Sequence, residues 1–242
     1  MSLLRLDKII SDNGIASRSE ARKMIASGRV WVDGKAITCA DLKIDTGDSE
    51  IRLDGNVING ESLRYFMLYK PEGVVTATED RSQKTVIDLL PKELTCLKLF
   101  PVGRLDKDTT GLLILTNDGE FCHTVTSPKR HIRKLYEVTV DGMLELDDTE
   151  AFIKGIVLQD GTECLPATLE IDENNTSHGF VKIYEGQYHQ VKRMLASRGK
   201  HVRTLKRIAV GNLSLDVSMK PGDYKELSEK DINLIINKNV TN

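Results

Sequence analysis

The first sixty residues combine a helical repeat of apolar positions with a stretch of strict alternation. Apolar side chains at positions 6, 9 and 10 share one helical face and predict a short helix that ends at Asn13-Gly14. Ser17 and Glu20 have the spacing of a capping box and predict a second helix that ends at Gly28. The next segment alternates and turns at Asp33-Gly34, which favours a β-hairpin. The pattern therefore predicts a small module of two helices and a hairpin.

After a turn-rich segment at 54–60, the pattern changes to strands separated by glycine turns. That segment has no apolar period and predicts a boundary between a domain of residues 1–60 and a domain of residues 61–242. In the second domain, short apolar or alternating runs predict strands at 64–71, 112–116, 134–142, 155–161 and 178–186. Helical patterns are fewer and fall at 149–153, 190–197 and 229–236. This succession predicts an α+β fold on a mixed, largely antiparallel sheet.

The composition of the chain is that of a globular protein. Its 242 residues are 40% hydrophobic and 29% charged, which suits one or two domains with a sizeable core. No apolar run approaches the roughly 18 residues of a membrane span, and the N-terminal apolar stretch is too short for a secretory signal. We therefore expect a cytoplasmic monomer with no membrane partner. The four cysteines include no Cys-x-x-Cys pair, so we expect reduced thiols and no zinc site.

Charges are segregated along the chain, although the net charge is only −2. Residues 186–207 carry seven cations and no carboxylate, and residues 128–134 carry four cations and no carboxylate. Residues 141–173 carry ten acids and a single lysine. Basic blocks of this size predict a surface for a polyanion, and we expect the acidic segment on a face turned away from it. The alternative is chance clustering on a solvated surface.

The sequence RLDKIISDNGIASRSEARKMIASGRVWVDGKAI resembles the S4 RNA-binding domain over about residues 3 to 50. The resemblance implies that basic side chains on the two helices and the following loop contact RNA phosphates. These side chains are Arg5, Lys8, Arg18, Arg22, Lys23 and Arg29. An excess of six cations over three acids in the first thirty residues agrees with that role. The alternative is a capped helix with ordinary solvated arginines.

One carboxylate, Asp106, lies on a polar turn between Arg104 and Lys107 in the stretch GRLDKDTTGLLILTNDG. The apolar run at 112–116 predicts a buried strand that would anchor this turn. Neighbouring cations lower the pKa of a carboxylate and keep it ionised, as a nucleophile requires. Asp106 is therefore a candidate nucleophile. The alternative is an aspartate that only makes a hydrogen bond within its own turn.

The same stretch resembles the signature of bacterial rRNA pseudouridine synthases, and three further segments join it in the family's order. These segments are RYFMLYKPEGVV, KLYEVTV and EGQYHQVKRML. Together with the S4 module, they look most like the branch that modifies 16S rRNA of the small subunit. Tyr69 departs from the pattern, because the family usually has Asn before Lys-Pro. The resemblance implies isomerisation of uridine to pseudouridine, in which the N1–C1′ bond breaks and a C5–C1′ bond forms, without a cofactor or metal.

The resemblance also implies roles for individual residues. Asp106 would be the catalytic carboxylate, which attacks C1′ or C6 or assists loss of the C2′ proton. Tyr136 would stack on the uracil near C5. Lys192 would pair with Asp106, and Arg193 is the alternative. Arg104 would support the flipped-out uridine.

Further candidate substrate-binding residues are Gln190, which we expect to organise the turn before its helix, and Arg193. The implied partner is ribosomal RNA, either 16S rRNA or an assembly intermediate of the 30S subunit.

Two other functions fit parts of the sequence. Residues 106–110 match the Asp-x-Asp-x-Thr motif of haloacid-dehalogenase-type phosphatases, which use magnesium, but the buried strand and the alternating strand-helix rhythm of that fold are absent from the pattern. A non-catalytic RNA-binding protein on the same scaffold is the second alternative. Asp106, Tyr136 and Lys192, all present, argue against it.

Overall fold

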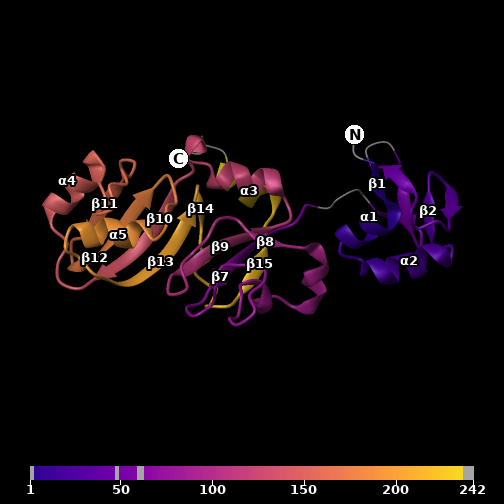
Figure 1. Ribbon diagram of the computed structural model, residues 1–242, viewed down its shortest axis with the longest axis horizontal. Coiled ribbons are helices and arrows are strands. Elements are labelled where there is room, and N and C mark those ends of the chain that lie inside the picture. The colour runs from indigo at the N-terminus through magenta and orange to yellow at the C-terminus, as the bar shows by residue number, and fades with distance from the viewer. Residues whose placement is uncertain (1–2, 47–48, 59–62, 237–242) are drawn as a thin grey trace. The chain divides into compact units, whose positions relative to one another are not determined.

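The computed structural model describes residues 3–46, 49–58 and 63–236. The chain divides into two compact units (Figure 1). The first contains Met1–Arg64 and Leu90–Leu99, and the second contains Tyr65–Leu89 and Phe100–Asn242. The predicted boundary between residues 60 and 61 lies outside the described residues.

The first unit is built from two helices and short strands around one apolar core. The helices are α1 (Leu6–Asp12) and α2 (Arg18–Ala26). The strands β2 (Val30–Val32), β3 (Lys35–Ile37), β5 (Ile51–Leu53) and β6 (Asn56–Ile58) form a sheet in the order β3-β2-β5-β6, and β1 (Leu3–Arg5) pairs with β4 (Lys43–Asp45). The predicted helices and hairpin are confirmed, whereas the other strands were not predicted.

The capping box of α2 is present as the sequence predicts. Glu20 N donates to Ser17 Oγ at 3.4 Å, and Ser17 N donates to Glu20 Oε2 at 2.9 Å. These bonds satisfy backbone donors that the first helical turn leaves without partners. Ala21 and Ile25 then face the core and are fully buried. Local sequence therefore determines both the start and the buried face of this helix.

Residues 90–99 add a short helical segment, η2 (Lys92–Leu97), to the first unit. Lys98 Nζ donates to Asp12 Oδ1 at 2.7 Å at the end of α1. Gly14 has a positive φ of 72°, and a Cβ there would collide with the side chain of Leu97. Glycine thus permits both the left-handed turn after α1 and the close approach of Leu97.

The second unit is organised on one large sheet with the strand order β11-β12-β10-β13-β9-β7-β15. The strands on this path are β7 (Tyr65–Lys70), β9 (Thr110–Thr116), β10 (Lys134–Val140), β11 (Thr168–Asp172), β12 (Asn175–Ile183), β13 (Val202–Val210) and β15 (Tyr224–Glu226). β9 and β13 run parallel, and the other neighbouring strands on the path run antiparallel. The predicted mixed, largely antiparallel sheet is confirmed. Its topology differs from the doubly wound parallel sheet of the phosphatase alternative, which is therefore wrong.

Helices and short elements flank this sheet. The helices are α3 (Gly119–Thr126), α4 (Leu146–Lys154), α5 (Gln190–Ser197) and α6 (Glu229–Ile236). Shorter elements are η1 (Ile87–Leu89), η3 (Pro128–Arg130), β8 (Phe100–Pro101) and β14 (Leu213–Ser214). Of the helices, α4, α5 and α6 were predicted and α3 was not. No helix in the described part of the chain is long and apolar enough to cross a membrane.

The centre of the sheet lies in the apolar core. Every residue from Gly111 to Thr116 in β9 is buried, as expected for a continuous apolar run covered on both faces. Around it pack Met67 from β7, Val210 from β13, Phe121 from α3 and Ile235 from α6. This core fixes the strand that directly follows the turn containing Asp106.

The parallel pairing of β9 with β13 brings two backbones into close contact at Gly111. Arg207 is the register partner of Gly111, which has a φ of 103°. A Cβ at this position would collide with the Arg207 backbone. Glycine is therefore required here for both reasons, and the start of β9 is held directly against β13.

Two predictions about the second unit are wrong. Residues 155–161 do not form a strand; they contain only an isolated bridge between Val157 and Glu163. The acidic segment does not form a face separate from the basic block, because the two pair with each other. The pairs join Arg193 to Asp160, Arg198 to Asp147 and Asp148, Lys200 to Glu145 and Asp148, and Arg203 to Asp141. Much of the basic charge is therefore neutralised within the protein.

Candidate active site

A tight turn presents Asp106 immediately before β9. Thr109 N donates to Asp106 O at 3.1 Å and closes the turn. On the preceding side, Thr76 Oγ1 donates to Leu105 O at 2.6 Å and accepts from Leu105 N at 3.2 Å. These bonds fix the backbone on both sides of Asp106, so the carboxylate is held in one direction.

Lys70, at the end of β7, holds the same turn through hydrogen bonds to its backbone carbonyls. Its side chain is fully buried, and Nζ donates to Thr109 O at 2.9 Å and to Lys107 O at 3.2 Å. Burial lowers the pKa of Lys70 to about 8, although the nearby Asp108 and Asp106 carboxylates act in the opposite direction. The buried ammonium therefore ties two carbonyls of the turn to the sheet.

The partners of Asp106 come from α5 and the residue before it. Lys192 Nζ lies 3.2 Å from Asp106 Oδ2, and His189 Nε2 lies 3.4 Å from Asp106 Oδ1. Lys192 Nζ also donates to Asp108 Oδ1 at 2.5 Å, and this bond lowers the pKa of the Asp108 carboxyl. The predicted pairing of Lys192 with Asp106 is present in the structure.

The cations next to Asp106 in sequence do not pair with it in the described structure. Lys107 Nζ donates instead to Gln83 Oε1 at 2.8 Å, and Arg104 is exposed at the cavity that contains Asp106. The side chains that contact the Asp106 carboxylate are therefore Lys192 and His189, not the two cations beside it in sequence.

The direction of Lys192 is set by the turn that begins α5. His189 precedes the helix in a left-handed conformation with a φ of 50°. Gln190 is buried; its Oε1 accepts from Gln187 N at 3.0 Å and its Nε2 donates to Glu185 Oε1 at 2.7 Å. Gln190 thus organises the turn, as predicted, and its amide is engaged within the protein.

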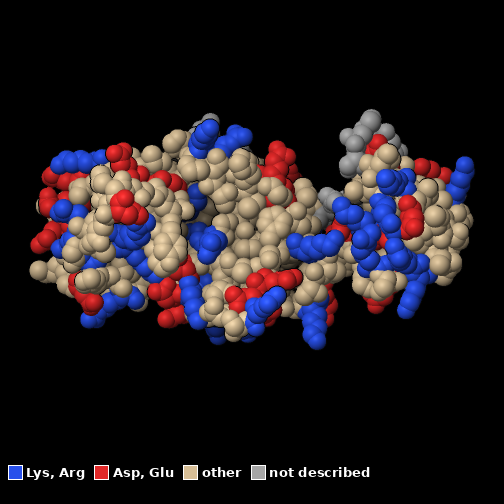
Figure 2. Space-filling view, viewed as in Figure 1, with Lys and Arg blue, Asp and Glu red and all other residues tan. Residues whose placement is uncertain are grey.

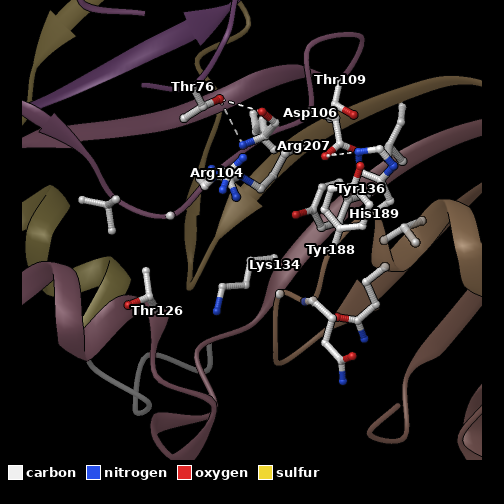
Figure 3. A pocket seen from close by; sticks show the side chains of 18 of the residues that line it. Thr76, Arg104, Asp106, Thr109, Thr126, Lys134, Tyr136, Tyr188, His189 and Arg207 are labelled. Atoms are coloured by element: carbon white, nitrogen blue, oxygen red, sulfur yellow. Dashed lines mark hydrogen bonds and ion pairs between the residues drawn. The ribbon is translucent and has the colours of Figure 1, made fainter. Parts of the chain in front are cut away.

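A cavity of about 690 Å³ opens beside Asp106. Figure 3 shows Asp106, Tyr136 and His189 together on one side of it. Tyr136, from β10, is only 8% exposed and lines this cavity. Tyr188 lies at 72% exposure with its ring stacked on that of His189 at 3.9 Å between centroids. The predicted pair of Asp106 and Tyr136 therefore lies at one cavity, although β13 separates β9 from β10 in the sheet.

Other predicted residues lie elsewhere. Arg193 Nη2 pairs with Asp160 Oδ2 at 2.5 Å, so the carboxylate it faces is not Asp106. In the first unit, Arg5, Arg18 and Arg22 all bind the buried carboxylate of Asp7. Arg29 pairs with Asp54. Lys and Arg side chains gather over this unit in Figure 2, and each of these four arginines keeps at least a third of its side chain accessible.

Four residues of the site were given no catalytic or substrate-binding role from the sequence. His189 contacts Asp106, and Lys70 supports the turn. Lys134 and Arg207 line the cavity. Both had been counted only as members of basic blocks, and the alternation in β10, which places Lys134 on the same face as Tyr136, could have identified the first of them. Among the residues described, no group of three or more His, Cys, Asp or Glu side chains could hold a metal ion.

Comparison with known proteins gives consistent matches to both units. A family model described as RNA pseudouridylate synthase matches residues 64–197, and a model of the S4 domain matches residues 4–49. The chain is 39% identical to an uncharacterized RNA pseudouridine synthase, YtzG, of Bacillus subtilis (strain 168), over 96% of this chain and 98% of the relative. It is also 39% identical to ribosomal small subunit pseudouridine synthase A of Escherichia coli (strain K12), over 96% of this chain and 100% of the relative.

The solved structures agree with the sequence matches. A crystal structure of a pseudouridylate synthase aligns with a TM-score of 0.68 at 37% identity, covering 96% of this chain and 100% of that chain. The fold and the matches define an RNA-modifying enzyme with an S4 domain. The chain belongs to the RNA pseudouridylate synthase family. The resemblance that the sequence suggested is confirmed at this level.

Proposed function

We propose that the protein isomerises a specific uridine of 16S ribosomal RNA to pseudouridine, with Asp106 as the catalytic carboxylate. The observation that carries the proposal is the position of Asp106 on a fixed turn, in a cavity that also contains Tyr136, with Lys192 paired to its carboxylate. The choice of 16S rRNA is supported by the near-complete alignment with relatives named ribosomal small subunit pseudouridine synthase A.

The arrangement suits a reaction in which the N1–C1′ bond breaks and C5 then bonds to C1′. Attack of Asp106 on C1′ or C6, or its assistance in loss of the C2′ proton, requires an ionised carboxylate held in one direction. Lys192 provides the opposite charge, and the turn provides the direction. Tyr136 offers an aromatic face for the uracil while it is detached and reoriented.

A uridine within folded RNA must leave its stack before it can enter this cavity. Arg104 is exposed at the cavity and its side chain carries no ion pair in the described structure. Its planar guanidinium can stack on bases and pair with phosphates. We therefore propose that Arg104 stabilises the RNA while the uridine is flipped out of its stack.

The S4 domain would supply affinity for the rRNA. Arg5, Arg18 and Arg22 converge on one buried carboxylate, which holds three guanidinium groups on the same surface. Arg29 adds a fourth accessible cation. Contacts of this kind bind phosphates without reading sequence. We infer that the enzyme acts as a monomer in the cytoplasm, on 16S rRNA or on an assembly intermediate of the 30S subunit.

The test is to map pseudouridine in 16S rRNA from a strain that lacks the protein, by carbodiimide-induced reverse-transcription stops. We expect one stop to disappear and to return when the wild-type gene, but not the Asp106→Asn variant, is restored. If every stop persists in the deletion strain, the alternative of a non-catalytic assembly protein is favoured. If a stop disappears in 23S rRNA instead, the proposed reaction stands but the proposed substrate, 16S rRNA, is wrong.

A further inference from the structure

Two buried cations lie in the wall of the Asp106 cavity. Lys134 is at the start of β10 and is 7% exposed, and Arg207 is in β13 and is 4% exposed. Both line the cavity. In the view of Figure 3, Lys134 lies on the opposite side of the cavity from Asp106 and His189.

The sheet directs these two side chains and Tyr136 toward the same space. Tyr136 is the register partner of Arg207 in the antiparallel pair of β10 and β13. Opposite residues of such a pair project from one face of the sheet, and residues two apart on a strand share that face. Lys134, Tyr136 and Arg207 therefore form a continuous part of the cavity wall.

Neither buried cation has a carboxylate partner in the described ranges of the chain. Lys134 Nζ donates to Val125 O at 3.1 Å, and Arg207 Nε donates to Leu112 O at 2.8 Å. The other six cations of residues 186–207 each form an ion pair with an acid. Arg207 thus differs from the rest of its block in being both buried and without an acidic partner.

Two like charges that are buried near one another oppose folding unless an anion accompanies them. Burial lowers the pKa of Lys134 to about 8, and the charge of Arg207 acts in the same direction. A Lys ammonium and an Arg guanidinium are the side chains that bind phosphate most strongly. Their position beside Tyr136 means that such an anion would lie next to the stacked base.

We propose that Lys134 and Arg207 form a subsite for the phosphate group of the uridine nucleotide whose base lies on Tyr136. The subsite rests on the proposed function, since that function places a uridine in the cavity. Its phosphate comes either from the phosphodiester backbone of the RNA or from a free uridine nucleotide. A phosphate held there fixes the ribose while the detached uracil turns between Tyr136 and Asp106.

The test compares binding of uridine 5′-monophosphate, uridine 3′-monophosphate and uridine to the full chain by calorimetry at pH 7. These ligands differ only in the phosphate. Since hydrogen bonds between charged groups contribute about 1.5 to 3 kcal/mol, we expect one monophosphate to bind at least about tenfold more tightly than uridine. We call the affinity for that monophosphate divided by the affinity for uridine the nucleotide ratio. Lys134→Met and Arg207→Met should reduce the nucleotide ratio to within about twofold and leave uridine affinity unchanged.

Lys129→Met is the matched control, because Lys129 is an exposed cation of the same 128–134 block as Lys134 and does not line the cavity. It should retain the ratio. Lys134→Gln removes the charge but keeps a donor for Val125 O, so it answers the question if the Met variant does not fold. Lys134→Arg, which keeps a positive charge, should retain most of the ratio.

Single-turnover modification of 16S rRNA by the same variants distinguishes the sources of the phosphate. A slower rate in Lys134→Met with an unaltered nucleotide ratio supports a subsite for the RNA phosphodiester alone. A collapsed ratio supports a subsite that also binds free nucleotide. The proposal is overturned if neither the ratio nor the rate changes in the Lys134 and Arg207 variants. If the wild-type protein makes no pseudouridine but its ratio collapses in the variants, the proposed function fails and the subsite stands.

Discussion

Lys192 Nζ lies 3.2 Å from Asp106 Oδ2. The lysine is in the first turn of α5, and the aspartate is on the turn before β9, so the contact joins two separate parts of the sheet unit. The two side chains are 21% and 24% exposed, so the pair is partly shielded from water. The carboxylate therefore has an ammonium partner and remains partly accessible to a bound nucleotide.

Replacement of Asp106 should abolish catalysis with little effect on binding. Asp106→Asn keeps the shape of the side chain and removes its charge, so we expect no detectable isomerisation in single-turnover assays. Affinity for 16S rRNA, measured by filter binding, should remain within about tenfold, because phosphate contacts elsewhere dominate it. Asp108→Asn is the control; it should retain turnover within about tenfold, since Asp108 contacts Lys192 but is more exposed. Equal loss in the two variants would contradict the assignment of Asp106 as the catalytic group.

Replacement of Lys192 should slow catalysis more than replacement of its neighbour. Lys192→Met leaves Asp106 without its ammonium partner, and we expect the single-turnover rate to fall about a hundredfold. Arg193→Met should lower the rate by less than about threefold, since Arg193 pairs with the exposed Asp160. The reverse order of effects would show that Arg193 is the partner of the catalytic carboxylate in the RNA complex.

The arginines of the S4 domain should affect affinity but not chemistry. A double variant, Arg18→Gln with Arg22→Gln, removes two half-exposed cations from α2. We expect weaker binding of 16S rRNA and a slope of log affinity against log salt that is shallower by about one to two. The rate at saturating RNA should not change. Arg52→Gln, which removes an exposed arginine of β5 that pairs with Glu50, should alter neither quantity and serves as the control.

Asp7 should make the S4 domain sensitive to acid. Burial tends to raise the pKa of its carboxyl, but hydrogen bonds from Arg5, Arg22 and Arg18 outweigh that effect and lower the pKa well below its usual range. A lowered folded pKa means that the stabilisation is fully present above the unfolded pKa of about 3.9 and is lost as the pH falls below it. The melting temperature of the wild-type protein should therefore fall steeply below about pH 4.

The same ion pairs predict the behaviour of an Asp7 variant. Asp7→Asn should be less stable than wild type at pH 7 by about 2 kcal/mol, because three guanidinium groups lose a common buried acceptor. The difference should shrink at acid pH. A constant difference between pH 7 and pH 3 would show that packing, not charge, accounts for the loss.

Lys134 should destabilise the free enzyme near neutral pH. Burial lowers its pKa to about 8, so between that value and the unfolded value of about 10.4 the unfolded chain holds more protons. Stability from this group therefore rises with pH across that interval. Lys134→Met should be more stable than wild type in urea denaturation at pH 7, and the gain should be smaller at pH 10. Because Lys70 is present in both proteins, its own titration cancels in the comparison. A gain that is independent of pH would contradict the charge as its cause.

Local sequence was sufficient for elements whose signals are local. The capping box at Ser17 and Glu20 located α2, and the apolar run at 112–116 located β9. The run at 155–161 failed as a strand because its glycine-bounded apolar residues pack without a neighbouring strand along most of their length. The sequence did not predict β13, although it is an interior strand of the sheet. Its several cations interrupt the alternation of apolar and polar residues that marks a strand.

The charge pairs of the site could not be read from the sequence in the same way. The turn identified Asp106, but its partner Lys192 lies in a distant helix and is predicted only by the family resemblance. The basic and acidic blocks looked like opposite faces because composition does not show which strands become neighbours. Arg198 and Asp147 belong to those two blocks, yet they meet in space because α5 and α4 place them together. Long-range pairing is decided by topology, which local periods do not encode.

The parallel contact of β9 with β13 also sets the order in which the enzyme becomes active during its own synthesis. The bond from Arg207 to Leu112 joins residues 95 positions apart, and the bond from Lys192 to Asp108 joins residues 84 apart. Contacts of such separation form only after a long loop has closed. When the Asp106 turn of a nascent chain leaves the ribosome, α5 and β13 are still inside the exit tunnel or have not been translated. We therefore expect the nascent polypeptide to lack isomerase activity until its translation is nearly complete, although its S4 domain emerges early.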